Sequence, residues 1–150
     1  MTTILVVDGD ATARRTTQYM LQTANYTVAP ACDVHQANMQ LMRMQSDLLI
    51  TELSSARFDG FAFLRALRAS EHYHALPVIV LTSSAHKRDH RRALQLGAVL
   101  CLAKPVQSDM LVGVVNRVLQ QRAIILQVAN NLSRGQVPEL LEGVPLGIAV

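Results

Sequence analysis

The fold is decided by the stretch Asp47–Gly60, which reads DLLITELSSARFDG. Residues 48–50 form an unbroken apolar run, as expected of a central parallel strand covered by helices on both faces. The run leads into the acidic residue Glu52, and an Asp-Gly pair closes the loop that follows. Because functional sites of open parallel sheets lie at the carboxyl ends of the strands, Glu52 is the first candidate for a functional side chain.

Four further apolar runs alternate with helical patterns along the chain. The runs are Ile4–Val7, Val78–Leu81, Val99–Ala103 and the weaker, partly polar Asn25–Ala29. The first helical pattern, Ala11–Thr23, places Tyr19 on its apolar face, and the second, with Asp33 as its N-cap, places Met42 there. Strands that alternate with helices on short connections favour a parallel sheet with right-handed crossovers. We therefore predict one doubly wound α/β domain of five strand–helix units over residues 1–122.

The composition is that of a folded domain. The 150 residues are 50% hydrophobic, which is enough for a core. No apolar run is long enough to cross a bilayer and the N-terminus shows no export signal, so a cytoplasmic protein is expected. Cys32 and Cys101 lack the spacing of metal ligands or redox motifs and are expected to be buried, reduced thiols. A net charge of +3 is small for a dedicated nucleic-acid binder.

Acidic, hydroxyl and basic residues stand at the carboxyl ends of four predicted strands. They are Asp8 and Asp10, separated by Gly9, after the first strand, Glu52 after the third, Thr82 after the fourth and Lys104 after the fifth. With the segments around them, these residues resemble the receiver domain of two-component response regulators in order and spacing. The matching segments are Val6-Val7-Asp8, Asp47–Glu52, Phe58-Asp59-Gly60, Pro77–Thr82, Gly97-Ala98 and Lys104-Pro105.

The resemblance implies a fold and a set of roles. The fold is flavodoxin-like, a five-stranded parallel sheet in the order 2-1-3-4-5. In such domains the acids after the first strand hold Mg²⁺, and a carboxylate after the third strand accepts a phosphoryl group from a histidine kinase. Thr82 and Lys104 match the residues that contact the phosphoryl oxygens, and Lys104-Pro105 matches a cis peptide bond. Metal and lysine neutralise the charge that develops during phosphoryl transfer.

The sequence departs from the receiver pattern at three positions, and all three concern the chemistry. Gly9 replaces the second acid of the first strand, which removes a carboxylate from the metal site. Glu52 stands at the acceptor position, and its extra methylene moves the oxygens by roughly 1.5 Å, where a misplacement of about 1 Å already costs much of the rate. Cys101 replaces the aromatic side chain that acts as a switch in the fifth strand.

Asp8, Asp10 and Glu52 remain as candidate ligands for Mg²⁺. Asp10 is placed either to cap the following helix or to replace the missing acid as a metal ligand. We expect the cap, and therefore no useful metal site. Without a metal, Asp8 and Glu52 would repel each other unless a cation lay between them, so we expect Lys104 to pair with one or both.

Two functions fit these residues. The first is a pseudo-receiver, a non-enzymatic interaction module of a two-component phosphorelay that works without phosphorylation, with Glu52 holding it near an active-like form. The second is a working phosphoacceptor, with Mg²⁺ and with Glu52 or a nearby group as acceptor. A flavodoxin-like cofactor binder is disfavoured, because the acidic turn Asp8-Gly9-Asp10 would repel phosphate. We favour the pseudo-receiver, with no cofactor.

A basic segment, His86–Arg92, opens the fourth predicted helix. The resemblance places it on the face that receivers use for output, formed by the fourth helix, the fifth strand and the last helix. Such a run is either a solvated surface or a site for an acidic signalling protein, such as a histidine kinase or an output protein. DNA is disfavoured, because the run is short and no recognition-helix motif accompanies it.

The last predicted helix, which starts near Ser108, keeps its apolar stripe beyond Arg122. The stripe continues through Ile124, Ile125, Leu126 and Val128, and Gly135 is the first stop signal after it. Residues 123–150 therefore form a helical extension with an apolar tail, which can fold back on the domain, pair two copies, or belong to a linker whose partner surface is missing. We favour a homodimer through the extended helix, because pairing explains a continuous stripe.

Overall fold

The computed structural model describes residues 1–56 and 58–135 and contains the predicted sheet. The five strands of the main sheet are β1 (Thr3–Val7), β2 (Thr27–Ala31), β3 (Leu48–Thr51), β6 (Val78–Thr82) and β7 (Leu100–Ala103). All neighbouring pairs are parallel, in the order β2-β1-β3-β6-β7. The flavodoxin-like order 2-1-3-4-5 of the successive strands is thus confirmed.

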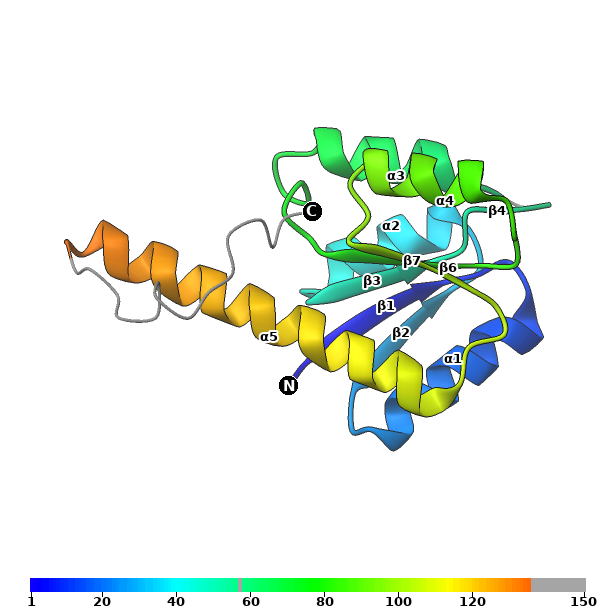
Figure 1. Cartoon of the computed structure of the whole chain (residues 1–150), viewed down its shortest axis with the longest axis horizontal. Helices are drawn as coiled ribbons and strands as arrows, with labels where there is room; N and C mark the ends of the chain where they lie inside the picture. Colours follow the sequence, from blue (N-terminus) through cyan, green and yellow to red (C-terminus); the bar gives the residue numbers. More distant parts are fainter. Residues whose placement is uncertain (57, 136–150) are drawn as a thin grey trace.

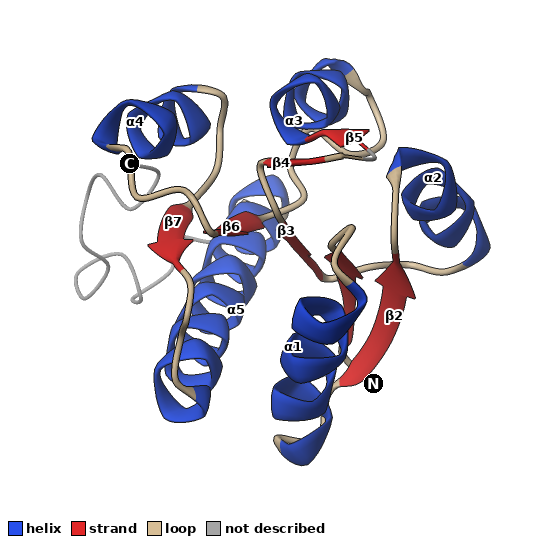
Figure 2. Ribbon diagram, turned by 90° about the vertical axis from the view of Figure 1, so that its right-hand side faces the viewer, coloured by secondary structure: helices blue, strands red, loops and turns tan. Residues whose placement is uncertain are grey.

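Helices cover both faces of the sheet. They are α1 (Ala11–Thr23), α2 (Val34–Arg43), α3 (Gly60–Ala69), α4 (Lys87–Gln95) and α5 (Ser108–Ser133). Helices α1 and α5 lie on one face, and α2, α3 and α4 on the other (Figures 1 and 2). Because successive strand residues point to opposite faces, Leu5 and Leu49 belong to the core under α2 and α3, whereas Ile4, Leu48 and Ile79 belong to the core under α1 and α5.

Two expectations about helix faces were wrong. Tyr19 is 72% exposed in α1, and Met42 is 83% exposed in α2. The buried residues are Thr17 and Leu21 in α1, four positions apart and therefore on one face, and Tyr19 lies between them on the opposite side. In α2 the buried face is likewise set by Ala37 and Leu41, which leaves the next residue outside.

A short antiparallel hairpin was not predicted. Strands β4 (Ser54–Ser55) and β5 (Phe58–Asp59) lie between β3 and α3. The chain then enters α3 at Gly60, where an added Cβ would lie 2.3 Å from the Leu53 carbonyl oxygen and 2.4 Å from that of Glu52. Only glycine allows this approach of backbone to backbone, so the Asp-Gly pair fixes how the loop leaves the end of β3.

Helix α5 is longer than the sheet can cover. It runs without a break from Ser108 to Ser133 and is followed by Gly135 with a positive φ of 76°, as the stop signal predicted. The predicted division between residues 1–122 and 123–150 falls inside this helix and stays a prediction. Beyond Gly135 the tail lies outside the described residues. Among those residues, no helix combines the length and hydropathy needed to span a membrane.

Candidate functional site

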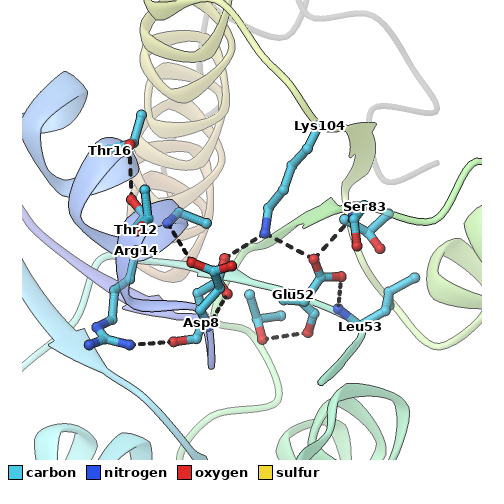
Figure 3. Close-up of polar contacts among 12 residues, drawn as sticks. Asp8, Thr12, Arg14, Thr16, Glu52, Leu53, Ser83 and Lys104 are labelled. Carbon is cyan, nitrogen blue, oxygen red and sulfur yellow. Dashed lines mark hydrogen bonds and ion pairs between the residues drawn. The ribbon is translucent and has the colours of Figure 1, made fainter. Parts of the chain in front are cut away.

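Three charged side chains meet at the carboxyl edge of the sheet (Figure 3). Asp8 follows β1, Glu52 follows β3 and Lys104 follows β7. Backbone hydrogen bonds extend the sheet past the strand ends, with the Glu52 N–H donating to Val7 O at 3.0 Å and the Lys104 N–H to Thr82 O at 2.7 Å. The sheet register therefore brings together residues that are up to 96 positions apart in the chain.

Lys104 lies between the two acids, as the sequence predicted. Its Nζ is 2.6 Å from Asp8 Oδ2 and 2.9 Å from Glu52 Oε2. Both acidic residues are only 5% exposed. Within the described part of the chain these are the two ion pairs, and both use the same ammonium group. The peptide bond between Lys104 and Pro105 is cis, also as expected.

Both carboxylate oxygens of Glu52 accept hydrogen bonds. Oε1 accepts from the Leu53 N–H at 2.7 Å, and Oε2 accepts from the Ser83 N–H at 3.1 Å as well as from Lys104. Burial opposes the charge on Glu52. Hydrogen bonds from Thr82, Lys104 and Leu53 outweigh that effect, so the pKa of this carboxyl lies below its ordinary value. Glu52 is therefore a buried, ionised group with hydrogen bonds on both oxygens, and not a solvated acid at a strand end.

The charged form of Lys104 is stabilised in the same way as that of Glu52. Burial opposes its charge, but hydrogen bonds to Asp8 and Glu52 outweigh the cost, and the pKa of the ammonium is raised. The cluster of Asp8, Glu52 and Lys104, hereafter the charged triad, carries a net charge of about −1 at neutral pH.

Asp10 caps a helix. Its Oδ1 accepts from the Ala13 N–H at 3.0 Å, and that backbone hydrogen bond lowers the pKa of its carboxyl. The Asp10 N–H in turn donates to Asp8 Oδ1 at 2.9 Å. The cap predicted for Asp10 is confirmed, and its carboxylate is occupied by the start of α1.

Gly9 has a neighbour that the sequence did not reveal. A Cβ added at this position would lie 2.5 Å from Ser55 Oγ and 2.9 Å from Ser55 Cβ. Ser55 belongs to the β4–β5 hairpin, so the hairpin occupies the space that a side chain after Asp8 would need. No local pattern links these residues, which are 46 positions apart.

The loop after β6 is also held by contacts that the sequence did not suggest. The Ser84 N–H donates to Thr82 Oγ1 at 3.0 Å, and Ser84 Oγ donates to Asp89 Oδ2 at 2.7 Å. His90 Nε2 lies 2.8 Å from the Ser84 carbonyl oxygen. The loop that supplies the Ser83 N–H to Glu52 is thereby tied to the first turn of α4.

The response regulator receiver domain matches residues 4–116. The chain belongs to this family. Among solved structures, it resembles the chemotaxis response regulator CheY4 of Vibrio cholerae, with a TM-score of 0.72 and 27% identity over 79% of this chain and 98% of that one. It also resembles the signal receiver domain of a signal transduction histidine kinase from Syntrophus aciditrophicus. The TM-score is 0.72 and the identity 28%, over 80% of this chain and 91% of that one.

Curated receiver-containing relatives are longer proteins. The gliding motility regulatory protein of Myxococcus xanthus is 32% identical over 67% of this chain and 13% of its own length. The sensor protein EvgS of Escherichia coli K12 is 35% identical over 72% of this chain and 9% of its own length. The DNA-binding dual master transcriptional regulator RpaA of Synechocystis is 28% identical over 100% of this chain and 65% of its own length. The matched part of this chain thus spans less than a sixth of the length of the first two relatives.

The residues at the carboxyl edge of the sheet do not fit a Mg²⁺ ion. Mg²⁺ needs carboxylate and water oxygens in near-octahedral geometry. Here Asp8 and Glu52 both bind Lys104, Asp10 caps α1, and Ser55 lies where a side chain at position 9 would start. Among the described residues, no three His, Cys, Asp or Glu side chains form a group that could hold a metal.

Cys101, which the resemblance matched to the switch position, lies in β7 beside Val80 of β6. The side chain is half-buried and packs against the core under α2, α3 and α4. Burial, with smaller contributions from Glu52 and Asp89, raises the pKa of its thiol to about 11. The thiol is therefore neutral at physiological pH and behaves as a small apolar group, which cannot reproduce the rotation of a large aromatic ring.

Proposed function

We propose that this receiver is a phosphorylation-independent signalling module in which Glu52 takes the place of a phosphorylated acceptor. The observation that carries the proposal is the shared hydrogen bonding of Glu52 Oε2 by Lys104 at 2.9 Å and by the Ser83 N–H at 3.1 Å. By resemblance, Lys104 and Thr82 would contact phosphoryl oxygens. In this chain Lys104 instead donates to the Glu52 carboxylate, and Thr82 Oγ1 accepts from the Ser84 N–H in the neighbouring loop.

The same contacts disfavour phosphoryl transfer to Glu52. An attacking carboxylate must have an oxygen free to meet phosphorus in line, with positive charge placed on the equatorial oxygens. Both oxygens of Glu52 already accept hydrogen bonds, and its lysine is shared with the Asp8 carboxylate. The other candidate, a working phosphoacceptor with Mg²⁺, would require the triad to separate first.

Intact mass after incubation with Mg²⁺ and a small acyl phosphate tests the proposal. We expect the mass of the native chain to stay unchanged, while a receiver that retains both acids and an aspartate acceptor gains one phosphoryl group under the same conditions. A phosphoryl group found on Glu52 or on a nearby residue would favour the working phosphoacceptor and contradict the proposal.

We propose that the module binds an acidic signalling protein, a kinase or an output protein, through the face of α4, β7 and α5. In α4 the exposed residues include Lys87, Arg88 and Arg91, whereas the one acid, Asp89, is bound by Ser84. The outward charge of this helix is therefore strongly positive. Arg88→Glu with Arg91→Glu should abolish co-purification of the partner, and Arg15→Glu on α1 is the matched control. Equal retention by both variants would contradict this surface.

We also propose a homodimer through the extended part of α5. Ile124 is 38% exposed and Leu132 is 53% exposed, on a helix that continues beyond the sheet. Apolar side chains on such a helix favour a self-complementary pairing. Light scattering should give a dimer for the full chain and a monomer for a chain that ends at Arg122. Two monomers of equal stability would contradict the pairing.

A further inference from the structure

A groove lies beside α5 at the end of the domain opposite the charged triad. It is formed by α5, by the loop that enters β6 and by the loop that enters β7, and its volume is about 400 Å³, within the range of about 300–1,000 Å³ typical of ligand sites. Its larger apolar lining residues are Leu76, Pro77, Val99, Val118, Ile125 and Leu126. Ile125 and Leu126 are about half exposed, so the groove presents apolar surface that the described residues leave uncovered.

Two arginines line the same groove, and neither has an acidic partner among the described residues. Arg68 donates to the carbonyl oxygens of His74 at 2.9 Å, Leu76 at 2.7 Å and Gly97 at 2.8 Å. Arg122 donates to Asp47 O at 2.6 Å. Neither guanidinium forms an ion pair within residues 1–56 and 58–135, and no acid lines the groove. Burial lowers the pKa of Arg68, as expected of a cation held among carbonyl groups.

The groove therefore fits a segment that combines apolar side chains with carboxylates. Aliphatic residues would cover Ile125 and Leu126, and a carboxylate near either arginine would supply the missing counter-charge. Such a segment follows α5 in this chain. Residues 136–150 read QVPELLEGVPLGIAV, with Glu139 and Glu142 on either side of Leu140-Leu141 and no basic residue.

We propose that residues 136–150 fold back and occupy this groove. Gly135, in a left-handed conformation, follows the last turn of α5 and allows the chain to reverse there. Ser133 lies seven positions after Leu126 in α5, about 10 Å along the axis at a rise of about 1.5 Å per residue. The residues from Gly135 to Leu141 reach up to about 20 Å when extended. The tail is thus long enough to place Leu140 and Leu141 beside Leu126.

The covalent link also favours the tail over a second copy. A segment tethered next to its site has an effective concentration on the order of millimolar, far above that of another chain in dilute solution. The homodimer proposed above can still use Ile124 and Leu132, which do not line the groove.

A single tryptophan in the tail tests the proposal in the full chain. The native sequence contains no tryptophan, so Leu141→Trp introduces one reporter. We expect a blue-shifted emission maximum and weak quenching by acrylamide, both independent of protein concentration. Adding Leu126→Asp should shift the emission to that of an exposed tryptophan. Adding Ile124→Asp, on the same helix but outside the groove, should leave it unchanged, and both added sites are exposed enough to spare the folded core.

Three results would overturn the proposal. The first is the emission of an exposed tryptophan in Leu141→Trp itself. The second is a blue shift that grows with concentration in step with dimer formation, which would assign the groove to a second copy. The third is a blue shift that survives Leu126→Asp, which would place the tail elsewhere. Because circular dichroism reports the fold separately, an unfolded variant is recognised and replaced by Leu126→Ser.

Discussion

Lys104→Met is expected to lower the free energy of unfolding by about 3–5 kcal/mol, the usual effect of removing one partner from a buried ion pair. Asp8 and Glu52 are each 5% exposed and both bind the Lys104 ammonium. Without it, two buried carboxylates of like charge face each other, and each loses its ion pair. Urea unfolding at neutral pH measures the loss. Lys87→Met on exposed α4 is the matched control and should change stability by less than about 0.5 kcal/mol.

The pH dependence distinguishes lost charge pairing from lost packing. In the native chain the pKa of Glu52 is lowered from 4.5 and that of Lys104 is raised from 10.5. The contribution of Glu52 is thus present above its unfolded pKa and is lost as the pH falls through the folded pKa. That of Lys104 is present below 10.5 and is lost as the pH rises through its folded pKa. The triad stabilises most between these limits.

In the Lys104→Met variant, the effect of these carboxylates on stability in acid should be reversed. Its facing carboxylates would have raised pKa values, so the folded state would bind protons more tightly than the unfolded state. The deficit relative to the native chain should therefore shrink as the pH falls from 7 toward 4. A variant as stable as the native chain, or a deficit that does not change with pH, would mean that the pocket is open and solvated.

Local patterns were enough to predict most of the fold. The runs that became β1, β3 and β6 are continuously apolar because both of their faces are buried, and the helix starts at Asp10 and Asp33 carry side chains that cap their own helices. The triad could also be predicted, because parallel strands bring their carboxyl ends to one edge. At that edge, two acids without a metal need a cation.

Contacts between loops could not be predicted in this way. Ser55 reaches Gly9 from a hairpin, and Ser84 ties its loop to Asp89 and His90, yet none of these residues follows a periodic pattern. Gly9 illustrates the consequence. The sequence shows that an acid is missing there, whereas the structure shows that its space is also filled. Restoring the acid is therefore not a single change.

Gly9→Asp alone is expected to destabilise the chain by about 1–3 kcal/mol, the usual cost of overpacking, because its Cβ would meet Ser55 Oγ at 2.5 Å. Ser55→Gly in the same chain should recover most of that loss by removing both contacting atoms. Thermal unfolding of the single and double variants gives the comparison. Equal instability of both would mean that Ser55 does not set the cost at position 9.

Adding Glu52→Asp to Gly9→Asp and Ser55→Gly is expected to turn the chain into a metal-dependent phosphoacceptor. The shorter side chain withdraws from Lys104 and Ser83, and two acids after β1 then face an acceptor of the usual length. A bound ion must stabilise the folded state by mass action, by about 2.7 kcal/mol at a hundred times its dissociation constant. Millimolar Mg²⁺ should thus raise the melting temperature of the triple variant but not that of the native chain, and an acyl phosphate should add one phosphoryl group to the triple variant alone. If the triple variant folds and binds Mg²⁺ but remains unmodified, the block lies elsewhere, at Cys101 or in the loops. If the double variant Gly9→Asp with Glu52→Asp, which keeps Ser55, is stabilised by Mg²⁺ as much as the triple variant, the hairpin is no obstacle to the metal.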